Sequence, residues 1–455
     1  RSPHKKEETA EDRDTDRDRQ SPAAMSSAPS SSPSCGQASL CPQVFAGGVT
    51  PATAPSANPS GDFFDLDGQL TAQERELRMR VRTFMESHSA DLNDAYERAE
   101  FPHHLLEPIA KEIGVGGLCS RGYGCQETTP LGACLTAMEI ARVDGSLFTF
   151  HSVHGNVAML AIDKCGSEEQ KKRWLPKMAA CELIGSFALT EPDFGSDATA
   201  LESTARRVKG GFILNGKKRW IGNALFDGLI VVWARDLDTQ KIAGFVVEPT
   251  KTDPATLKRS RIEHKISQRM VQNANIELLD CFVPDENVLP GGTDFSKGAG
   301  LVLHWSRLII AWGPVGLSMG AFDRCLHYLQ HRKQFGVPLV SFQLVQDKLM
   351  RMLANIQAML YMALQVTGQA AKGKMTSGQV SLLKAHNTWR GRECVALARE
   401  LLGGNGIVDE PEYGLGVARC FLDMEAMHTY EGTFDINILV AGREVTKVGA
   451  FKAKL

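Results

Sequence analysis

The sequence predicts an α+β multidomain protein, with an N-terminal helical domain, a central β-sheet domain and a C-terminal four-helix-bundle-like domain. Three observations lead to this prediction. Apolar residues recur at helical spacing up to about residue 185, short strand-like runs between Gly and Asn turn signals follow, and helical spacing returns from Arg307. Because ligand sites tend to lie where domains meet, we expect a cleft at these boundaries.

The composition is that of a globular chain with balanced charge. Of the 455 residues, 43% are hydrophobic, and 51 Lys and Arg nearly balance 53 Asp and Glu. This balance provides no strong field for nucleic acid or for an anionic membrane. No apolar run reaches the length of about 18 residues that a membrane span requires, and no segment resembles a secretory signal. We expect a small-molecule partner, no nucleic acid and no membrane insertion.

The eleven cysteines are scattered along the chain. They form no CxxC pair and no Cys/His cluster at metal-ligand spacing. This pattern predicts reduced thiols in an intracellular compartment, no disulfide scaffold and no metal site.

Residues 1–61 are predicted to be a disordered tail. The first part of this stretch is charge-rich, and the second is dominated by Ser, Pro, Ala and Gly. Neither part has enough large apolar side chains to offset the entropy lost on folding.

The N-terminal helical domain is predicted at residues 62–185. Thr71 and Glu74 have the spacing of a capping box, and a helical apolar face follows at Leu77, Val81 and Phe84. Ser167 and Gln170 repeat the capping spacing, and Pro176 predicts the end of that helix.

The central β domain is predicted at residues 186–294. "ARRVKGGFILNGKKRWIGNA" carries Gly-Gly and Asn-Gly turn signals between short segments. The runs "LIVVWA", "IAGFVVEP" and "NIELLDCFVP" have the length and composition of strands.

The C-terminal helical domain is predicted at residues 295–451. Its clearest helix is "LVQDKLMRMLANIQAML". One continuous apolar stripe runs along that helix: Val345, Leu349, Met352, Ile356 and Met359.

Individual segments leave their function open. The chain has no GxGxxG after a strand, no GxxxxGK[ST], no HExxH and no GxSxG. "LLGGNG" suits either a phosphate-binding loop or the glycine-rich end of a helix. "FALTEPDFGSDA" suits either a site that contacts the polar edge of a ring and a phosphate, or a turn at the end of a strand. Arg332 and Phe335 in "HRKQFG" suit a pyrophosphate and a ring, or a helix C-terminus. Glu431 in "TYEGT" is a surface acid or a catalytic group.

Together these segments favour one family. "FALTEPDFGSDA", "KKRWIGN", "HRKQFG", "LLGGNG" and "TYEGTFDI" occur in the order and at nearly the spacing found in the acyl-CoA dehydrogenase and oxidase family. The chain resembles that family from about residue 62 to 451, and the family supplies the same α-β-α plan. Within the family, "KKRWIGNA", "RMVQN" and "TYEGTFDINILVAGREVTKVGAF" are most similar to plant-type peroxisomal short-chain acyl-CoA oxidases, with glutaryl-CoA dehydrogenases next.

The resemblance implies a function and assigns roles. It implies FAD-dependent oxidation of a fatty acyl-CoA to the trans-2-enoyl-CoA, with Glu431 as the base that takes the α-proton and with its backbone N–H on the thioester oxygen. A base in a water-poor cleft is expected to have a raised pKa. The implied cofactor-binding residues are Leu189, Thr190, Ser196, Trp220, Gly222, Arg332, Phe335, Gln343, Gly404 and Thr433, and the implied substrate-binding residues are Ser196 and Arg307.

Two departures from the family pattern bear on the reaction. Dehydrogenases of the family carry Thr or Ser at the position of Gly222, whereas the oxidases carry glycine, so this residue favours oxygen as acceptor. The alternative is that a tight strand-end turn requires glycine here. The stretch from Gly404 to Glu431 is about four residues longer than in relatives, so we expect it to loop out near the cofactor.

The chain ends in Ala453, Lys454 and Leu455, a terminus similar to a peroxisomal address. We therefore predict a peroxisomal targeting tail at 452–455, an import receptor as partner, and location in the peroxisome.

Three functions remain open from the sequence. The first is an acyl-CoA oxidase that passes electrons to oxygen and releases hydrogen peroxide, as in the first step of peroxisomal β-oxidation. The second is an acyl-CoA dehydrogenase, possibly glutaryl-CoA-like in substrate, that uses an electron-transfer flavoprotein. The third is an inactive binding protein on the same fold. The resemblance also implies a homodimer or homotetramer with the cofactor at a subunit boundary.

Overall fold

The computed structural model describes residues 63–409 and 416–449, all of which belong to one unit of the chain, 55–455. Residues 1–61 and 452–455 lie outside the described residues, as do residues 410–415 within the longer stretch from Gly404 to Glu431. The tail, targeting and insertion predictions therefore remain predictions.

The N-terminal part is helical, as the sequence predicts. Its α-helices are α2 (Ala72–Ser87), α3 (Ser89–Arg98), α4 (Leu106–Pro108), α5 (Pro130–Val143), α6 (Gly145–His151), α7 (Met159–Cys165) and α8 (Glu168–Ala179). Two π-helical turns interrupt them, η3 (Ile109–Ile113) and η4 (Ser152–Ala158).

Short 3₁₀ turns occur in all three parts of the described chain. They are η1 (Asp67–Gln69), η2 (His103–Leu105), η5 (Ala198–Ala200), η6 (Pro249–Lys251), η7 (Asp285–Asn287), η8 (Leu339–Ser341) and η9 (Gly403–Gly406).

Helix starts agree with the capping signals, and one helix end does not. The side chains of Thr71 and Glu74 form a reciprocal capping box at the start of α2, and Ser167 and Gln170 form another at the start of α8. Pro176 was expected to end α8, but the helix continues to Ala179. A proline removes only one helical hydrogen bond, and here the helix ends within one turn of it.

The β domain is a sheet that comprises seven strands within the described residues. The strands are β1 (Gly185–Ala188), β2 (Thr204–Val208), β3 (Gly211–Ile221), β4 (Leu229–Asp236), β5 (Ile242–Val247), β6 (Leu257–Arg261) and β7 (Ala274–Pro284). The main path is β1-β4-β2-β3-β7-β6, and β5 pairs with β4. β1 and β2 run parallel to β4, and the other pairs are antiparallel.

One of the two predicted turns in this domain is wrong. Lys209 and Gly210 form the turn between β2 and β3, and Gly211 is the first residue of β3, paired with Val208. Asn215 and Gly216, however, lie inside β3, where the register with β7 shifts between Leu214 and Gly216. Gly216 has φ 148°, and a Cβ there would lie 2.2 Å from Oγ of Ser203, so glycine is required by close approach in a bulge and not by a hairpin.

The C-terminal part consists of long helices. They are α9 (Ala299–His331), α10 (Gln343–Ala371), α11 (Ser377–Leu401), α12 (Val417–Thr429) and α13 (Phe434–Thr446). The predicted stripe on α10 is confirmed, because Leu349, Met352, Ile356 and Met359 are buried and Val345 is partly buried. α5 packs on α9 and α2 packs on α5, so the two helical parts share one core.

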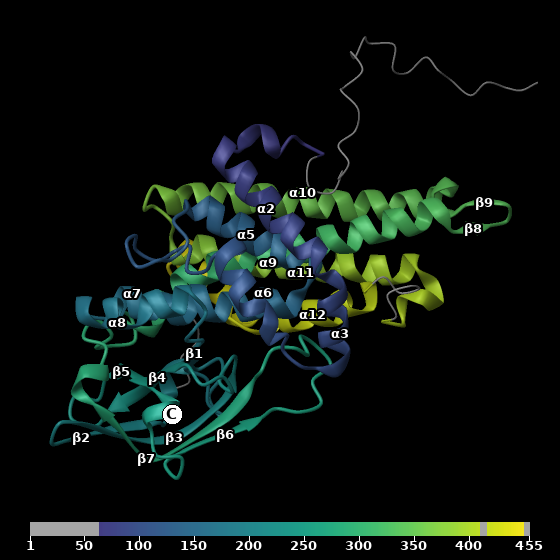
Figure 1. The fold of residues 1–455 in the computed structure, drawn as a ribbon. Helices are drawn as coiled ribbons and strands as arrows, with labels where there is room; N and C mark the ends of the chain where they lie inside the picture. Colours follow the sequence, from purple (N-terminus) through teal and green to yellow (C-terminus); the bar gives the residue numbers. More distant parts are fainter. Residues whose placement is uncertain (1–62, 410–415, 450–455) are drawn as a thin grey trace, which may run out of the picture. The chain divides into compact units, whose positions relative to one another are not determined.

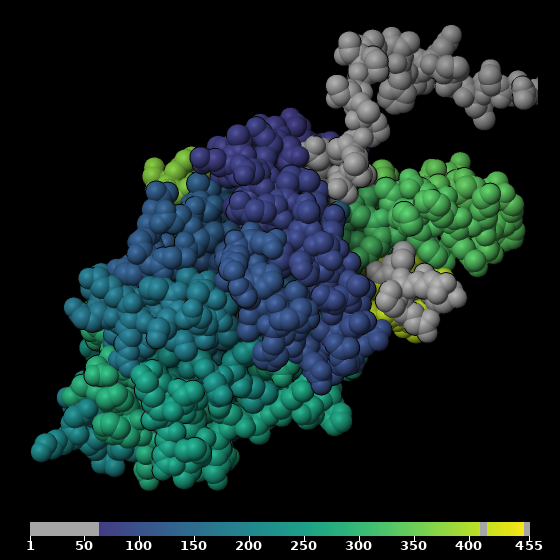
Figure 2. Space-filling model, viewed as in Figure 1, coloured from purple at the N-terminus to yellow at the C-terminus, as the bar shows by residue number. Residues whose placement is uncertain are grey.

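A small hairpin stands apart from this core. β8 (Lys333–Gln334) and β9 (Val337–Pro338) connect α9 to α10 and extend beyond the neighbouring helices (Figures 1 and 2). Figure 2 shows the N-terminal helices, in purple and blue, on the near face, with the green hairpin region projecting to the right. Among the described residues, no helix combines the length and the apolar character needed to cross a bilayer.

Candidate active site

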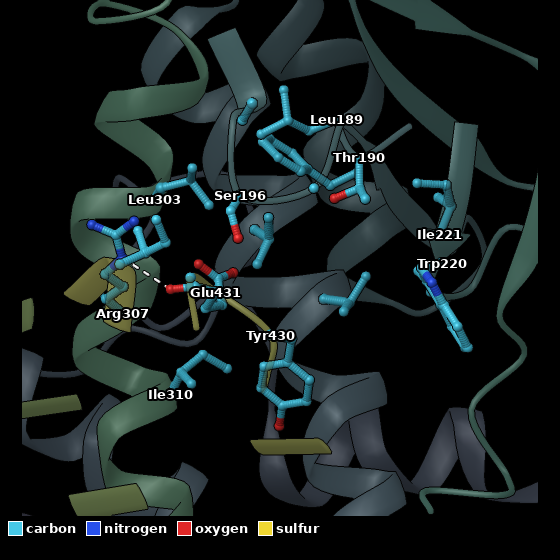
Figure 3. Close-up of a pocket in the computed structure, with 18 of the residues that line it drawn as sticks. Leu189, Thr190, Ser196, Trp220, Ile221, Leu303, Arg307, Ile310, Tyr430 and Glu431 are labelled. Carbon is cyan, nitrogen blue, oxygen red and sulfur yellow. Dashed lines mark hydrogen bonds between the residues drawn. The ribbon is translucent and has the colours of Figure 1, made fainter. Parts of the chain in front are cut away.

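Glu431 lies in the short connection between α12 and α13, and its side chain faces a cavity (Figure 3). α12 ends at Thr429, and Thr433 caps α13 by accepting a hydrogen bond from the N–H of Ile436 at 3.3 Å. Glu431 itself has φ 57°, in the left-handed region, which costs a non-glycine residue about 1–2 kcal/mol. Such strain is commonly found at functional sites.

The Glu431 carboxylate has the environment of a base. The hydroxyl of Ser306, which is fully buried on α9, donates to Oε2 of Glu431 at 3.1 Å. Burial raises the pKa of Glu431, while the charge of Arg307, the Ser306 hydrogen bond and the charge of Lys384 act in the opposite direction. The net shift is upward, so its basicity moves toward the value that proton abstraction near neutral pH requires.

The backbone of Glu431 is held at its carbonyl and open at its amide. Nε of Arg307 donates to the Glu431 carbonyl oxygen at 3.1 Å, along the dashed line in Figure 3. No acceptor within the described ranges receives a hydrogen bond from the Glu431 N–H. This amide, next to the carboxylate, can therefore donate to a ligand oxygen.

The cavity in front of Glu431 has a volume of about 530 Å³. Its wall comes from parts of the chain that are far apart in sequence. These are α6 and η4 (Thr149, Ser152, Val153, Val157), β1 and the segment after it (Phe187, Leu189, Thr190, 195–199), the end of β3 and the residue after it (220–222), α9 and the segment before it (Phe295, Leu303, Arg307, Ile310), the connection 430–432, and α13 (Ile436, Val440, Arg443). Asn273 completes the wall. Valine, leucine, isoleucine and phenylalanine side chains dominate several of these segments, as expected for a site that takes an acyl chain.

The structure brings seven of the predicted site residues together around this cavity. They are Leu189, Thr190, Ser196, Trp220, Gly222, Arg307 and Glu431. The other five, Arg332, Phe335, Gln343, Gly404 and Thr433, do not line it.

A buried ion pair fixes the segment that carries Leu189 and Thr190. Nζ of Lys218 donates to Oε1 of Glu191 at 2.9 Å, to the Leu189 carbonyl at 3.1 Å and to the Trp233 carbonyl at 2.7 Å. The Glu191 carboxylate also accepts from the backbone N–H groups of Glu202 and Ser203. Glu191 is therefore a structural residue that holds the end of β1 at the cavity.

Trp220 presents its ring at the edge of the cavity because of a bulge in β3. The register with β7 shifts between Lys218 and Ile221, and Trp220 has φ 63° within that shift. The residue is 52% exposed, with the Arg219 guanidinium 5.1 Å from the ring centroid. An exposed indole at a cavity mouth is suited to cover a flat ring.

Gly222 does not owe its identity to a strained turn. Its φ is not in the left-handed region, where Trp220 and Asn223 do lie. A Cβ at this position would approach Cγ2 of Val153 to 3.3 Å, which is tight but requires only a small adjustment. Gly222 does lie in the turn that follows β3, but its φ does not require glycine there, and a side chain at 222 would enter the cavity wall.

The predicted adenine and pyrophosphate residues lie apart from the cavity. Arg332 and Phe335 are on the exposed β8–β9 hairpin region, where Phe335 has φ 52° and is 94% exposed, and Gln343 begins α10. Gly404 is exposed in η9, after α11 exits through Gly403 at φ 60°. The assignment of these residues to the dinucleotide therefore remains a prediction of the family resemblance.

Sequence reasoning missed three residues beside Glu431. Tyr430 lines the cavity, and its hydroxyl lies 3.1 Å from Oγ1 of Thr149. Ser306 directly precedes Arg307 and was within reach of the same motif comparison. Lys384 stands on the buried side of α11 between Leu383 and Ala385, and a lysine within an apolar helical pattern was the available signal.

Comparison with known families matches nearly the whole described chain. Residues 71–182, 186–281 and 298–446 match the N-terminal, middle and C-terminal domains of acyl-CoA dehydrogenase. The order of these matches agrees with the helical, β and helical parts of the structure. The predicted fold class is confirmed.

Individual relatives cover almost their full lengths. The mitochondrial 2-methylacyl-CoA dehydrogenase of Solanum tuberosum is 30% identical over 83% of this chain and 92% of the relative. Glutaryl-CoA dehydrogenase of Desulfococcus multivorans is 28% identical over 82% of this chain and 96% of the relative. A solved glutaryl-CoA dehydrogenase from Mycobacterium smegmatis, in complex with FADH2, has a TM-score of 0.82 and 32% identity over 87% of this chain and 100% of that chain.

Proposed function

Since this chain belongs to the acyl-CoA dehydrogenase family, we propose that Glu431 takes the α-proton of an acyl-CoA thioester while the β-hydride leaves for FAD. The coarser function follows from the family: an FAD-dependent oxidoreductase that acts on the CH–CH bond of an acyl-CoA. The observation that supports the residue assignment is the Glu431 carboxylate at the cavity, with a raised pKa and the hydrogen bond from Ser306.

The residues around the cavity fit the flavin. Trp220 offers an exposed indole at the cavity edge, and Ser196 offers an exposed hydroxyl on another part of the wall, near Glu431 (Figure 3). The Thr190 hydroxyl is directed into the same space (Figure 3). These groups would hold the ring system, which when bound accepts the hydride from the β-carbon.

The chain's own residues carry the proton side of the reaction. Arg307 holds the Glu431 carbonyl, Glu431 lines the cavity, and its N–H has no acceptor among the described residues. The amide would donate to the thioester oxygen and stabilise the negative charge that develops as the α-proton leaves. The apolar wall excludes water, which strengthens both interactions.

We infer a short acyl group as the substrate. The cavity must hold the reacting part of the flavin and the acyl chain in about 530 Å³, and Val153, Val157 and Ile310 supply apolar wall. Relatives are named for 2-methylacyl-, isovaleryl- and glutaryl-CoA, all short acyl groups.

Two electron acceptors each have an observation in their favour. The reported relatives are named dehydrogenases, which favours an electron-transfer protein as acceptor. Gly222 favours oxygen, because no backbone constraint requires glycine there and no hydroxyl stands at that point of the wall. Peroxisomal location, which would accompany oxygen as acceptor, depends on residues 453–455.

One experiment tests the function and separates these acceptors. The purified flavoprotein is reduced without air by butyryl-, hexanoyl-, isovaleryl- or glutaryl-CoA while flavin absorbance is followed. Bleaching by a short acyl-CoA is expected, and its absence with every thioester would refute the proposed function and favour an inactive binding protein. Air is then admitted: rapid reoxidation with stoichiometric peroxide identifies an oxidase, and a flavin that stays reduced until an electron-transfer flavoprotein is added identifies a dehydrogenase.

A further inference from the structure

Lys384 bridges the two sides of the turn that carries Glu431. It lies on α11 and is completely buried. Its Nζ donates to the carbonyl oxygen of Gly432 at 2.8 Å and to that of His428 at 3.2 Å. One accepting residue precedes Glu431 and the other follows it directly, so a single ammonium group sets the distance between the two ends of the turn.

The His428 carbonyl needs a donor from outside its helix, and the Gly432 carbonyl lies in the connection between α12 and α13. His428 is one of the last residues of α12, and the final carbonyls of a helix have no partner within it. Glu431 and Gly432 have φ 57° and 82°, so the chain leaves the helical path before α13 begins. A lysine is a suitable partner at such a C-terminus because its charge also complements the helix dipole.

The turn has further supports from α9 and α13. Arg307 donates to the Glu431 carbonyl at 3.1 Å and reaches Oγ of Ser381, which lies one turn before Lys384, at 3.5 Å. Nδ2 of Asn437 donates to the Gly432 carbonyl at 2.8 Å. Glu431 is therefore placed by donors on three helices, and Lys384 is the donor from α11.

The charge of Lys384 also acts on Glu431. The facing ionisable groups are Glu431, Arg307 on α9 and His428 on α12. Burial lowers the pKa of Lys384 to about 7, with Glu431 opposing and Arg307 adding to this effect. Below that pH Lys384 is charged and, with Arg307, limits the upward pKa shift of Glu431.

We propose that Lys384 is a positioning residue for the reaction, which holds the carbonyls on both sides of Glu431 and thereby fixes where its carboxylate points. This role rests on the proposed function. The simpler alternative is that Lys384 only completes the end of α12 and contributes to stability. The two explanations differ in what the loss of Lys384 does to kcat and to the pH profile.

Asn387 provides a matched control on the same helix. It is also completely buried, and its Nδ2 donates to two carbonyls, those of Ala311 at 2.9 Å and Met359 at 3.3 Å. These acceptors lie on α9 and α10, away from the turn that carries Glu431. Asn387→Leu therefore removes a comparable set of buried hydrogen bonds from α11 without touching that turn.

The experiment compares Lys384→Met with Asn387→Leu in the complete holoprotein. For Lys384→Met we expect kcat for butyryl-CoA to fall by about tenfold to a hundredfold, the scale of a small misplacement of a reacting group, with KM changed by less than about threefold. The acid limb of the kcat profile should move to higher pH, because a charge that lowers the pKa of Glu431 is gone. Amide hydrogen exchange across 428–433 should become faster. For Asn387→Leu we expect a lower Tm with kcat, acid limb and exchange of 428–433 close to those of the unsubstituted protein.

The outcomes separate the proposal from its premise. If the unsubstituted protein does not reduce its flavin with any acyl-CoA, the proposed function fails and the role of Lys384 falls with it. If it does, and Lys384→Met matches Asn387→Leu in kcat, acid limb and exchange, Lys384 is structural and the proposal is overturned. Should Lys384→Met not fold, Lys384→Gln keeps a shorter N–H donor without charge. It should then show a lower kcat and faster exchange of 428–433 together with the displaced acid limb, and kcat and exchange like those of the unsubstituted protein would equally overturn the proposal.

Discussion

The hydroxyl of Ser306 donates to Oε2 of Glu431 across 3.1 Å and links the middle of the site to α9. This bond stabilises the charged carboxylate, and it is one of three influences that oppose the rise in pKa caused by burial. Ser306 thus lowers the pKa of Glu431, as Arg307 and Lys384 do, but through a hydrogen bond from a neutral group.

Ser306→Ala should move the acid limb of kcat/KM to higher pH. The hydrogen bond lowers the pKa of Glu431, so its loss leaves the base protonated up to a higher pH. We expect kcat above the limb to fall by less than about tenfold, since the carboxylate remains. Ser306→Thr retains the hydroxyl and is the control. An acid limb that stays in place in Ser306→Ala would show that the bond is weak in the working protein.

Glu431→Gln should retain FAD and lose most of its turnover. Glutamine has nearly the same shape, so the cavity wall is preserved, but it cannot accept the α-proton. We expect turnover of butyryl- or hexanoyl-CoA to fall by at least about a hundredfold, the scale for losing a general base. The flavin spectrum measures cofactor content and steady-state assays measure turnover. Near-normal turnover would remove Glu431 from the mechanism.

Gly222→Ser tests whether the open wall position serves oxygen. The added Cβ would lie 3.3 Å from Cγ2 of Val153, so we expect the protein to fold with little loss of stability. If oxygen is the acceptor, reoxidation of the reduced flavin in air should slow, while anaerobic reduction by acyl-CoA changes less. Stopped-flow absorbance measures both steps. Equal reoxidation rates in Gly222→Ser and in the unsubstituted protein would show that Gly222 does not determine the electron acceptor.

Phe335→Ala should weaken FAD retention without destabilising the fold. The side chain is 94% exposed, so its removal costs the isolated chain almost no packing. If the β8–β9 hairpin contacts the dinucleotide of a second subunit, the variant should lose flavin more readily on gel filtration at an unchanged Tm. Val337→Ala, in the same hairpin and 40% exposed, is a control for general loss of apolar surface. Normal flavin retention in Phe335→Ala would refute the predicted contact.

Deletion of Ala453, Lys454 and Leu455 should leave activity intact and change only location. These residues are outside the described part of the chain, so the prediction depends on the sequence pattern alone. A fluorescently tagged full chain should appear in peroxisomes, and the deletion should move it to the cytosol. Unchanged punctate fluorescence after deletion would mean that the address lies elsewhere.

Local patterns predicted the helices well because their causes are local. The capping boxes at Thr71 and Ser167 need only residues three positions away, and the stripe on α10 needs only one repeating spacing. Asn215-Gly216 was misread for the opposite reason. This dipeptide lies in β3, which pairs with β7 about sixty residues later. Because of that long-range pairing, the dipeptide forms a bulge within a strand and not the turn of a hairpin.

Only part of the site was predictable from the sequence, and that part was assigned by comparison with the family pattern. Glu431 and Trp220 were assigned because each stands in one of the quoted family segments, and Arg307 because it occupies a substrate-binding position of the family. Lys384 belongs to no such segment, although its Nζ lies 2.8 Å from the carbonyl next to Glu431. A contact between residues 48 positions apart in sequence cannot be read from spacing, because it depends on how α11 packs against α12 and α13.

The exposed β8–β9 hairpin has a consequence for the cofactor content of dilute samples. If Phe335 and Arg332 complete the dinucleotide site of a neighbouring subunit, FAD and subunit association are thermodynamically linked. Dilution below the dissociation constant of the subunits would then release the flavin from chains that are still folded. The yellow colour per mole of chain would fall with protein concentration, and added FAD would shift the subunits back toward association.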